Sequence, residues 1–181
     1  MERYHDKEWG IPQKNDNILY EYFLLDTFQA GLSWAIILSK RKDFRKAFSN
    51  FNISAISRYG RGERNRLLGN SGIVRNKRKI EAAVSNAKLV LDIQKEYGSF
   101  AKYLWGFTRG KTLDHKPRRE EDIPTSSKEA EAMSYDMRKR GFKFVGPTTL
   151  YAFMQGCGMV NDHLIGCIAR GVPKRKPRTV S

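Results

Sequence analysis

The stretch RGFKFVGPTTLYAFMQGCGMVNDH, residues 140–163, predicts two helices joined by a tight hairpin. Gly141 follows a run of good helix formers and suits the left-handed residue that closes a helix. Pro147 suits the first position of the next helix, because that position needs no backbone N–H donor. Between these two residues, the side chains expected to point into a core are Phe142, Phe144 and Val145.

The start of the second helix is a natural anion site, because its first backbone N–H groups have no helical acceptor. Gly146 allows a close approach of the backbone to a partner, and Lys143 is expected to point outward. These features are typical of helix-hairpin-helix elements, which bind the DNA backbone without reading its sequence. They also fit an ordinary corner between two helices, and this stretch alone does not separate the two interpretations.

The composition favours a folded protein with a polyanionic partner. The chain has 181 residues, of which 40% are hydrophobic, enough for one large domain or two small lobes. A formal net charge of +15 indicates nucleic acid or an anionic membrane surface as partner. No apolar run is long enough to cross a bilayer, and no cleavable signal opens the chain. We therefore expect a cytoplasmic protein that does not span a membrane.

The hydrophobic spacing predicts an all-α fold, with no alternating run that calls for a sheet. Asn76 is expected to cap the longest helix, and Ser126 and Glu129 have capping-box spacing ahead of the hairpin. We expect residues 1–15 to form an extended or turn-rich arm. The expected helical segments are 16–30, 40–48, 53–58, 61–68, 77–96, 99–107 and the helix-hairpin-helix at about 126–157.

The domain organisation expected from this pattern is simple. Residues 1–169 form a single all-α domain. Residues 170–181 are rich in proline, arginine and lysine and lack helical periodicity. We expect this tail to be disordered and to add only nonspecific affinity for a polyanion.

Asp26 falls on an otherwise apolar helix face. A carboxylate buried there must be paired or hydrogen-bonded. Its donors would come either from a bound base or from a protein group such as a helix N-cap or an arginine. Tyr4, Trp9 and Trp34 lie near glycines, where aromatic rings can form a pocket wall. Core packing is the commoner fate of any one such ring.

His163 and Cys167 are candidate metal ligands. They lie four residues apart, so a helix would place them on one face. His5 is a third candidate, and both residue types bind zinc. Two or three such residues are a weak signal, because a structural zinc site usually has four ligands.

Four motifs, in order along the chain, resemble the bacterial 3-methyladenine DNA glycosylase I family. The resemblance implies an all-α helix-hairpin-helix glycosylase fold and a monomer that acts on alkylated double-stranded DNA and has no membrane partner. It implies hydrolytic excision of 3-methyladenine. The competing interpretations are a helix-hairpin-helix protein that binds DNA but has lost activity, and a zinc-dependent hydrolase. The motifs are YHDKEWG at 4–10, FQAGLSW at 28–34, GFKFVG at 141–146 and VNDH at 160–163.

The resemblance also implies roles for individual residues. The excised base would stack against Tyr4 and Trp34, with Trp9 in the same pocket. Asp26, the candidate catalytic residue, would hydrogen-bond the base from a position where the family usually has the longer glutamate. Leu32 would fill the gap left by an extruded nucleotide. The full set of residues expected to contact DNA is Leu32, Gly141, Lys143, Gly146, Thr148 and Thr149.

The resemblance bears on lyase activity and on metal as well. Asn161 lies where many helix-hairpin-helix glycosylases place a catalytic aspartate, and no lysine is identified as a Schiff-base former. A monofunctional glycosylase is therefore implied. The family carries a structural zinc, and three of its four ligand positions correspond to His5, His163 and Cys167. The fourth, a cysteine near the N-terminus, has no counterpart in this sequence, which predicts weak or absent zinc binding.

Overall fold

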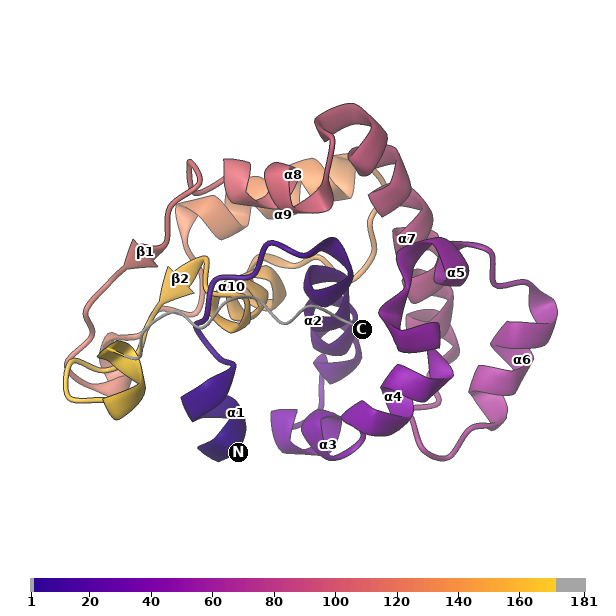
Figure 1. Cartoon of the computed structure of the whole chain (residues 1–181), viewed down its shortest axis with the longest axis horizontal. Coiled ribbons are helices and arrows are strands. Elements are labelled where there is room, and N and C mark those ends of the chain that lie inside the picture. Colours follow the sequence, from indigo (N-terminus) through magenta and orange to yellow (C-terminus); the bar gives the residue numbers. More distant parts are fainter. Residues whose placement is uncertain (1, 172–181) are drawn as a thin grey trace.

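The computed structural model describes residues 2–171 and confirms the all-α prediction (Figure 1). Residues 172–181 of the predicted tail lie outside the described residues. The helices are α1 Glu2–Lys7, α2 Asp16–Gln29, α3 Trp34–Ser39, α4 Arg41–Ala47, α5 Ile53–Ser57, α6 Arg61–Gly69, α7 Lys77–Tyr97, α8 Phe100–Gly106, α9 Lys128–Lys139 and α10 Pro147–Gly156. The short 3-10 helices are η1 Ser49–Phe51, η2 Glu120–Asp122 and η3 Ile168–Gly171, and the strands are β1 Leu113–Asp114 and β2 Val160–Asn161.

Helix α2 is the centre of the molecule. Figure 1 shows it between the group α4–α7 on one side and α8–α10 on the other. Every residue from Ile18 to Phe28 is buried, as is usual for a helix that other elements cover on all sides. Asn15 caps its N-terminus, and Asp16 reaches α8, where it accepts from the Phe100 N–H and the Ala101 N–H, each at 2.9 Å. The one acidic side chain near its other end, Asp26, is thereby placed deep in the protein.

The helix boundaries follow local signals in most places. Asn76 caps α7 as predicted, accepting from the Lys79 N–H at 3.1 Å. The capping box predicted for Ser126 and Glu129 is wrong, because the helix begins one residue later. Ser127 is the N-cap of α9 and accepts from the Ala130 N–H at 3.2 Å. Two adjacent serines offer the same chemistry, so spacing alone did not distinguish them.

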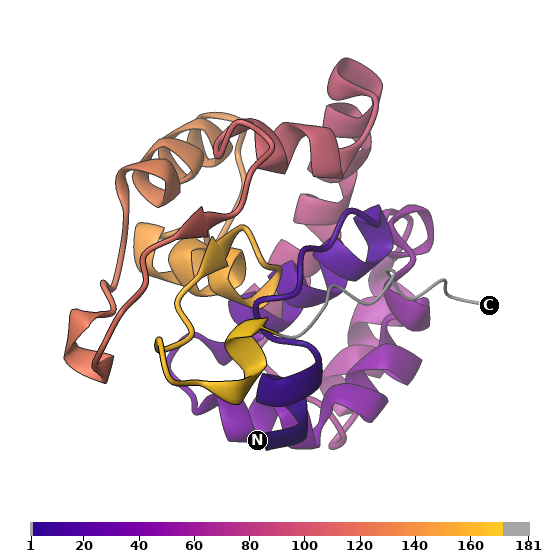
Figure 2. The same ribbon diagram turned by 60° about the vertical axis from the view of Figure 1, so that its left-hand side comes forward.

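The prediction of an extended or turn-rich arm over residues 1–15 is wrong for residues 2–7. Residues 2–7 form α1, which packs beside η3, so the two ends of the described chain meet (Figure 2). The chain then crosses the end of α10. The Gly10 N–H donates to the Gln155 carbonyl at 3.1 Å, and the Gln13 N–H donates to the Cys157 carbonyl at 2.9 Å. These long-range backbone bonds hold the segment in place.

The small parallel sheet was also not predicted. Leu113 pairs with Val160 and Asp114 with Asn161, so the connector after α8 is fastened to the chain after α10. Strands this short carry no recognisable alternation of polar and apolar residues.

None of the described helices is long and apolar enough to span a membrane.

The hairpin between α9 and α10 closes as predicted. Gly141 is left-handed, with φ +96, and its N–H donates to the Arg138 carbonyl at 2.9 Å. The Phe142 N–H donates to the Met137 carbonyl at 3.0 Å, which completes a Schellman motif. Pro147 is the first residue of α10. The local sequence therefore determined both ends of the hairpin.

One residue inside the hairpin differs from the prediction. Phe142 and Val145 are buried and Lys143 is exposed, as expected. Phe144 is only half-buried. Its φ is +58, a left-handed conformation that interrupts the predicted inward orientation.

Candidate active site

A cavity of about 500 Å³ opens where α1, α2, α3 and α10 meet. It contains all four residues that the sequence analysis assigned to a base pocket, although they come from three separate segments. No lysine is among the described residues that line it. The lining residues are Glu2, Tyr4, His5, Asp6, Trp9, Asp26, Gln29, Trp34, Ala152 and Gln155.

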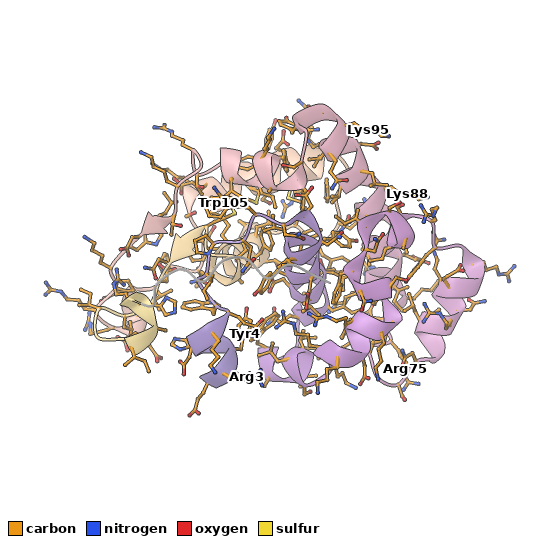
Figure 3. All side chains as sticks on the ribbon, in the orientation of Figure 1. Arg3, Tyr4, Arg75, Lys88, Lys95 and Trp105 are labelled. Atoms are coloured by element: carbon orange, nitrogen blue, oxygen red, sulfur yellow. The ribbon has the colours of Figure 1, made fainter. Side chains whose placement is uncertain are left out.

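Tyr4 and Trp34 form the aromatic walls of this cavity. Their ring centroids lie 5.5 Å apart with an interplanar angle of 57°. A planar ligand would therefore stack on one ring and meet the other obliquely. Burial, with Tyr22 nearby, raises the pKa of the Tyr4 phenol above its ordinary value, so the hydroxyl keeps its proton and can donate. Figure 3 shows Tyr4 on α1.

Asp26 is the acidic group of the cavity that is carried by α2. It is 7% exposed, and burial raises the pKa of its carboxyl well above the ordinary aspartate value. Among the described residues, neither an arginine nor a helix N-cap donates to this carboxyl. Because buried polar groups are normally satisfied, its carboxyl is suited to a ligand that enters the cavity.

An ion-pair cluster that the sequence analysis missed anchors α1, the helix that carries Tyr4. Arg41 donates to Glu8 at 2.6 Å and to Glu21 at 2.7 Å, and Arg45 also donates to Glu21. Glu21 is 5% exposed on the buried helix α2. A glutamate on such an apolar helix was the available signal, since a buried carboxylate needs a cationic partner.

Trp9 separates the cavity from a second group of polar side chains. Its ring meets His163 edge-on, with centroids 4.6 Å apart, and is stacked with His5 at 5.7 Å. His163 therefore lies behind the Trp9 wall of the base cavity, whereas His5 lines the cavity itself.

His5, His163 and Cys167 form a cluster that can hold a metal ion, with one ligand atom from each lying within 4.8 Å of the others. The predicted shared helical face is wrong, because residues 164–167 form a turn. The Cys167 N–H donates to the Leu164 carbonyl at 2.9 Å and closes this turn. A tight turn brings residues four apart together just as a helix does.

The donor chemistry of the cluster fits zinc. Nδ1 of His163 is bonded to Asn161 at 2.9 Å, and Nδ1 of His5 to Asp6 at 2.9 Å. Metal-binding histidines usually have such a partner on the second nitrogen. Nε2 of His5 faces Sγ of Cys167 at 3.8 Å, and Nε2 of His163 is buried without a partner among the described residues, so both nitrogens point into the cluster.

Asp162 does not belong to this cluster. Its carboxylate accepts from Tyr151 at 2.6 Å and Gln155 at 2.7 Å and is paired with His115 at 2.8 Å. With its oxygens occupied, Asp162 is a structural acceptor between α10 and the connector. It does not line the base cavity.

The hairpin is held rigidly by a residue that no sequence signal identified. Asn86 of α7 is 1% exposed and binds both peptide groups of Lys143, accepting from its N–H at 2.9 Å and donating to its carbonyl at 3.0 Å. Ser134 donates to the Val145 carbonyl at 2.6 Å. These bonds fix the hairpin before any partner arrives.

The expected DNA-contacting residues do not line the base cavity, but they lie on or next to α2 and α10, which do contribute to it. Gly146 caps α10 and no side chain caps it, so the N–H groups of Thr148 and Thr149 face an uncapped end. One turn further along α10, Ala152 lines the cavity. Leu32 lies half-buried between α2 and α3, two residues before Trp34.

The chain is similar to known proteins along almost its whole length. The methyladenine glycosylase family model matches residues 1–170. DNA-3-methyladenine glycosylase 1 of Escherichia coli strain K12 is 38% identical, over 96% of this chain and 92% of its own length. DNA-3-methyladenine glycosylase of Haemophilus influenzae is 40% identical, over 91% of this chain and 89% of its own length. The solved 3-methyladenine DNA glycosylase I of Staphylococcus aureus has a TM-score of 0.91 at 34% identity, covering 96% of this chain and 92% of that one. A helical fold with this hairpin and pocket, matched along almost the whole chain, places the protein in the methyladenine glycosylase family.

Proposed function

We propose that this protein is a DNA-repair glycosylase that extrudes 3-methyladenine from alkylated duplex DNA and hydrolyses its N-glycosidic bond. One observation carries the proposal. A single cavity presents aromatic walls and a buried carboxyl with no protein partner among the described residues, and α10 connects that cavity to the hairpin. The names of the similar proteins specify 3-methyladenine, which supports this choice of substrate.

The chemistry explains why so few groups are enough. Alkylation at N3 gives adenine a positive charge and makes it a good leaving group, and the bond breaks through an oxocarbenium-like transition state that water completes. Extrusion costs a few kcal/mol. Stacking on Tyr4 and Trp34 returns about 1–3 kcal/mol per base. The protein's main task is therefore to bind the extruded base and admit water.

Asp26 supplies selection by charge in this mechanism. An ionised carboxylate in a cavity of low polarity favours a cationic base over neutral adenine. The protonated Tyr4 hydroxyl is a second polar group that lines this cavity. Trp9 completes the pocket and separates it from His163.

We propose that the enzyme is monofunctional and leaves the DNA strand intact. A lyase needs an amine that attacks the sugar, and the described residues that line the cavity include no lysine. Asp162 is already occupied by Tyr151, Gln155 and His115. The attack on the sugar is therefore left to water.

The direct test is base release from methylated duplex DNA. Chromatography is expected to show free 3-methyladenine as the main product, and gel analysis is expected to show strands that are cut only after alkaline treatment of abasic sites. Predominant release of 7-methylguanine would contradict the substrate. DNA binding without release of any base would favour the noncatalytic alternative.

We further propose that the hairpin residues Gly141–Thr149 bind phosphates. Gly146→Ala is expected to fold normally, because its φ is −64 and the nearest atom to an added methyl, on Arg138, is 3.8 Å away. It is expected to weaken binding equally across unrelated DNA sequences, since phosphate contacts carry little sequence information. Competition binding with several duplexes measures this, and a sequence-dependent loss would contradict it.

Salt dependence separates Gly146 from Lys143. Gly146→Ala removes no charge, so the slope of log affinity against log salt is expected to stay unchanged. Lys143→Ala is expected to reduce that slope by about one. Lys88→Ala, an exposed lysine on α7, is the control that should change neither affinity nor slope.

We propose that zinc is the metal of the His5, His163 and Cys167 cluster. When bound, zinc would tie α1 to the segment after β2, and it takes no part in base release. A protein site with three ligands is expected to hold zinc below about one equivalent per chain, because a closed site usually has four. Elemental analysis of the purified protein measures this.

His163→Ala is expected to lower the zinc content further, while the core of the domain stays folded. Stoichiometric zinc that survives both His5→Ala and Cys167→Ala would place the metal elsewhere. A domain with a core of this size should lose order only near α1 and η3 when the metal is removed.

We propose that residues 1–169 act as one monomeric domain, with the helix-hairpin-helix at 126–157. Arg170 and Gly171, which the sequence analysis assigned to a disordered tail, are the last residues of η3, and Arg170 bonds the His163 carbonyl and Asp114. A substrate in chromosomal DNA implies a cytoplasmic location in a bacterial cell.

A further inference from the structure

Lys79 is a buried lysine in the first turn of α7, 6% exposed. Its ammonium donates to the Phe28 carbonyl at 2.9 Å and to the Ala30 carbonyl at 2.6 Å. These carbonyls lie at the C-terminal end of α2, where helical acceptors have no N–H partner and the helix dipole is negative. The two carbonyls therefore stabilise the ammonium of Lys79, and the ammonium in turn holds the end of α2 in place.

The turn that follows is held from its other side as well. Gln29, which lines the base cavity, donates through its side-chain amide to the Leu32 carbonyl at 2.7 Å. The Leu32 N–H donates to the Gln29 carbonyl at 2.6 Å. Gly31 between them has φ +80 and is exposed. The short turn 30–32 is therefore fastened at both of its ends.

We propose that Lys79 is a positioning residue for nucleotide extrusion: it holds turn 30–32 so that Leu32 enters the gap that the extruded nucleotide leaves. Gln29 ties the same turn to the base cavity, so the depth of Leu32 in the duplex is matched to the position of the base. This inference rests on the proposed glycosylase function.

The geometry excludes two other roles for Lys79. It does not line the base cavity, so it does not attack the sugar or touch the base. Its ammonium is engaged by two main-chain carbonyls inside the protein, so it is not placed to neutralise a phosphate. Its effect on the reaction must pass through the turn.

The test compares the same lesions in paired and unpaired DNA. A biotinylated strand is methylated within a duplex, its complement is removed, and the strand is assayed alone and after reannealing. Lys79→Met keeps the length of the side chain and removes its charge and its donors. Excision from the duplex is expected to fall by about 10- to 100-fold, because this is the size of effect that the loss of a hydrogen bond to a charged group typically causes. Excision from the single strand, which needs no unpairing, is expected to change little.

Lys88→Met is the matched control. Lys88 lies on the outside of the same helix (Figure 3), is exposed, and should leave both rates unchanged. Lys79→Arg keeps the charge and should recover part of the duplex rate. If Lys79→Met does not fold, Lys79→Gln, which keeps one amide donor, takes its place.

A double-mutant cycle gives a second readout that does not depend on the single strand. Leu32→Ala should reduce excision from the duplex, and adding Lys79→Met should cause little further loss if both act through one turn. Additive losses, an equal loss on both substrates, or no loss with Lys79→Met would each overturn the inference. If the wild-type protein releases no base from duplex DNA, the proposed function fails instead.

Discussion

Replacing Asp26 with asparagine is expected to lower excision of 3-methyladenine by about 10²- to 10³-fold, the range seen when one preorganised electrostatic group is lost. The side chain keeps its size but can no longer carry a charge. The melting temperature is expected to stay the same or to rise. Burial raises the pKa of the Asp26 carboxyl, so the ionised form is unfavourable in the folded protein and asparagine removes that cost.

The pH dependence follows from the same shift. A carboxyl whose folded pKa lies above its unfolded pKa stabilises the fold when protonated, and that contribution is lost as the pH rises from the ordinary aspartate pKa through the raised one. Binding of the cationic base should show the opposite trend and increase as Asp26 ionises. A profile of kcat/KM against pH should therefore show the ionisation of the Asp26 carboxyl in the wild-type protein, and the profile of Asp26→Asn should lack it.

Asp26→Glu is the informative control for this prediction. It keeps the carboxyl and lengthens the side chain to the residue usual in the family, so activity should be retained or improved. Full activity of Asp26→Asn would show that the carboxyl is only structural.

Gly158→Ala is expected to lower the melting temperature by about 5–15 °C. Gly158 has φ +75, where a residue with a side chain is strained by about 1–2 kcal/mol. The added methyl would also lie 2.3 Å from the Pro12 nitrogen and 2.4 Å from the Ile11 carbonyl carbon. Overpacking typically costs a further 1–3 kcal/mol, and each kcal/mol shifts the melting temperature of a domain of this size by about 2–4 °C.

The clash matters for function because it falls on the segment that follows Trp9. These atoms are backbone, so no rotamer change relieves the overlap. Scanning calorimetry measures the stability, and the fluorescence of the pocket tryptophans reports displacement of the N-terminal segment. Gly166→Ala makes the same chemical change where no atom lies within 4 Å and φ is not positive, so it should be neutral within about 0.5 kcal/mol. Equal melting temperatures for the two variants would contradict the argument.

Much of the site could be assigned from the sequence because its motifs are local and ordered. The aromatic and acidic positions were found at Tyr4, Trp34 and Asp26 through a resemblance, while periodicity alone placed Asp26 on an apolar helix face. The structure places them in one cavity. The residues that support them were not found. Asn86, Lys79 and Arg41 each resemble an ordinary polar residue on a helix until the segments they bond are known.

The sequence by itself determined most of the helices, the left-handed Gly141, the proline at the start of α10 and the cap at Asn76. All of these depend on interactions within a few residues, which leave a pattern in the chain. Only the tertiary structure decided that residues 2–7 are helical, that residues 113–114 pair with 160–161, and that Lys79 closes the end of α2. Each of these requires a partner distant in sequence, and a backbone carbonyl or N–H has the same identity in every residue, so no local pattern marks which one will be bonded.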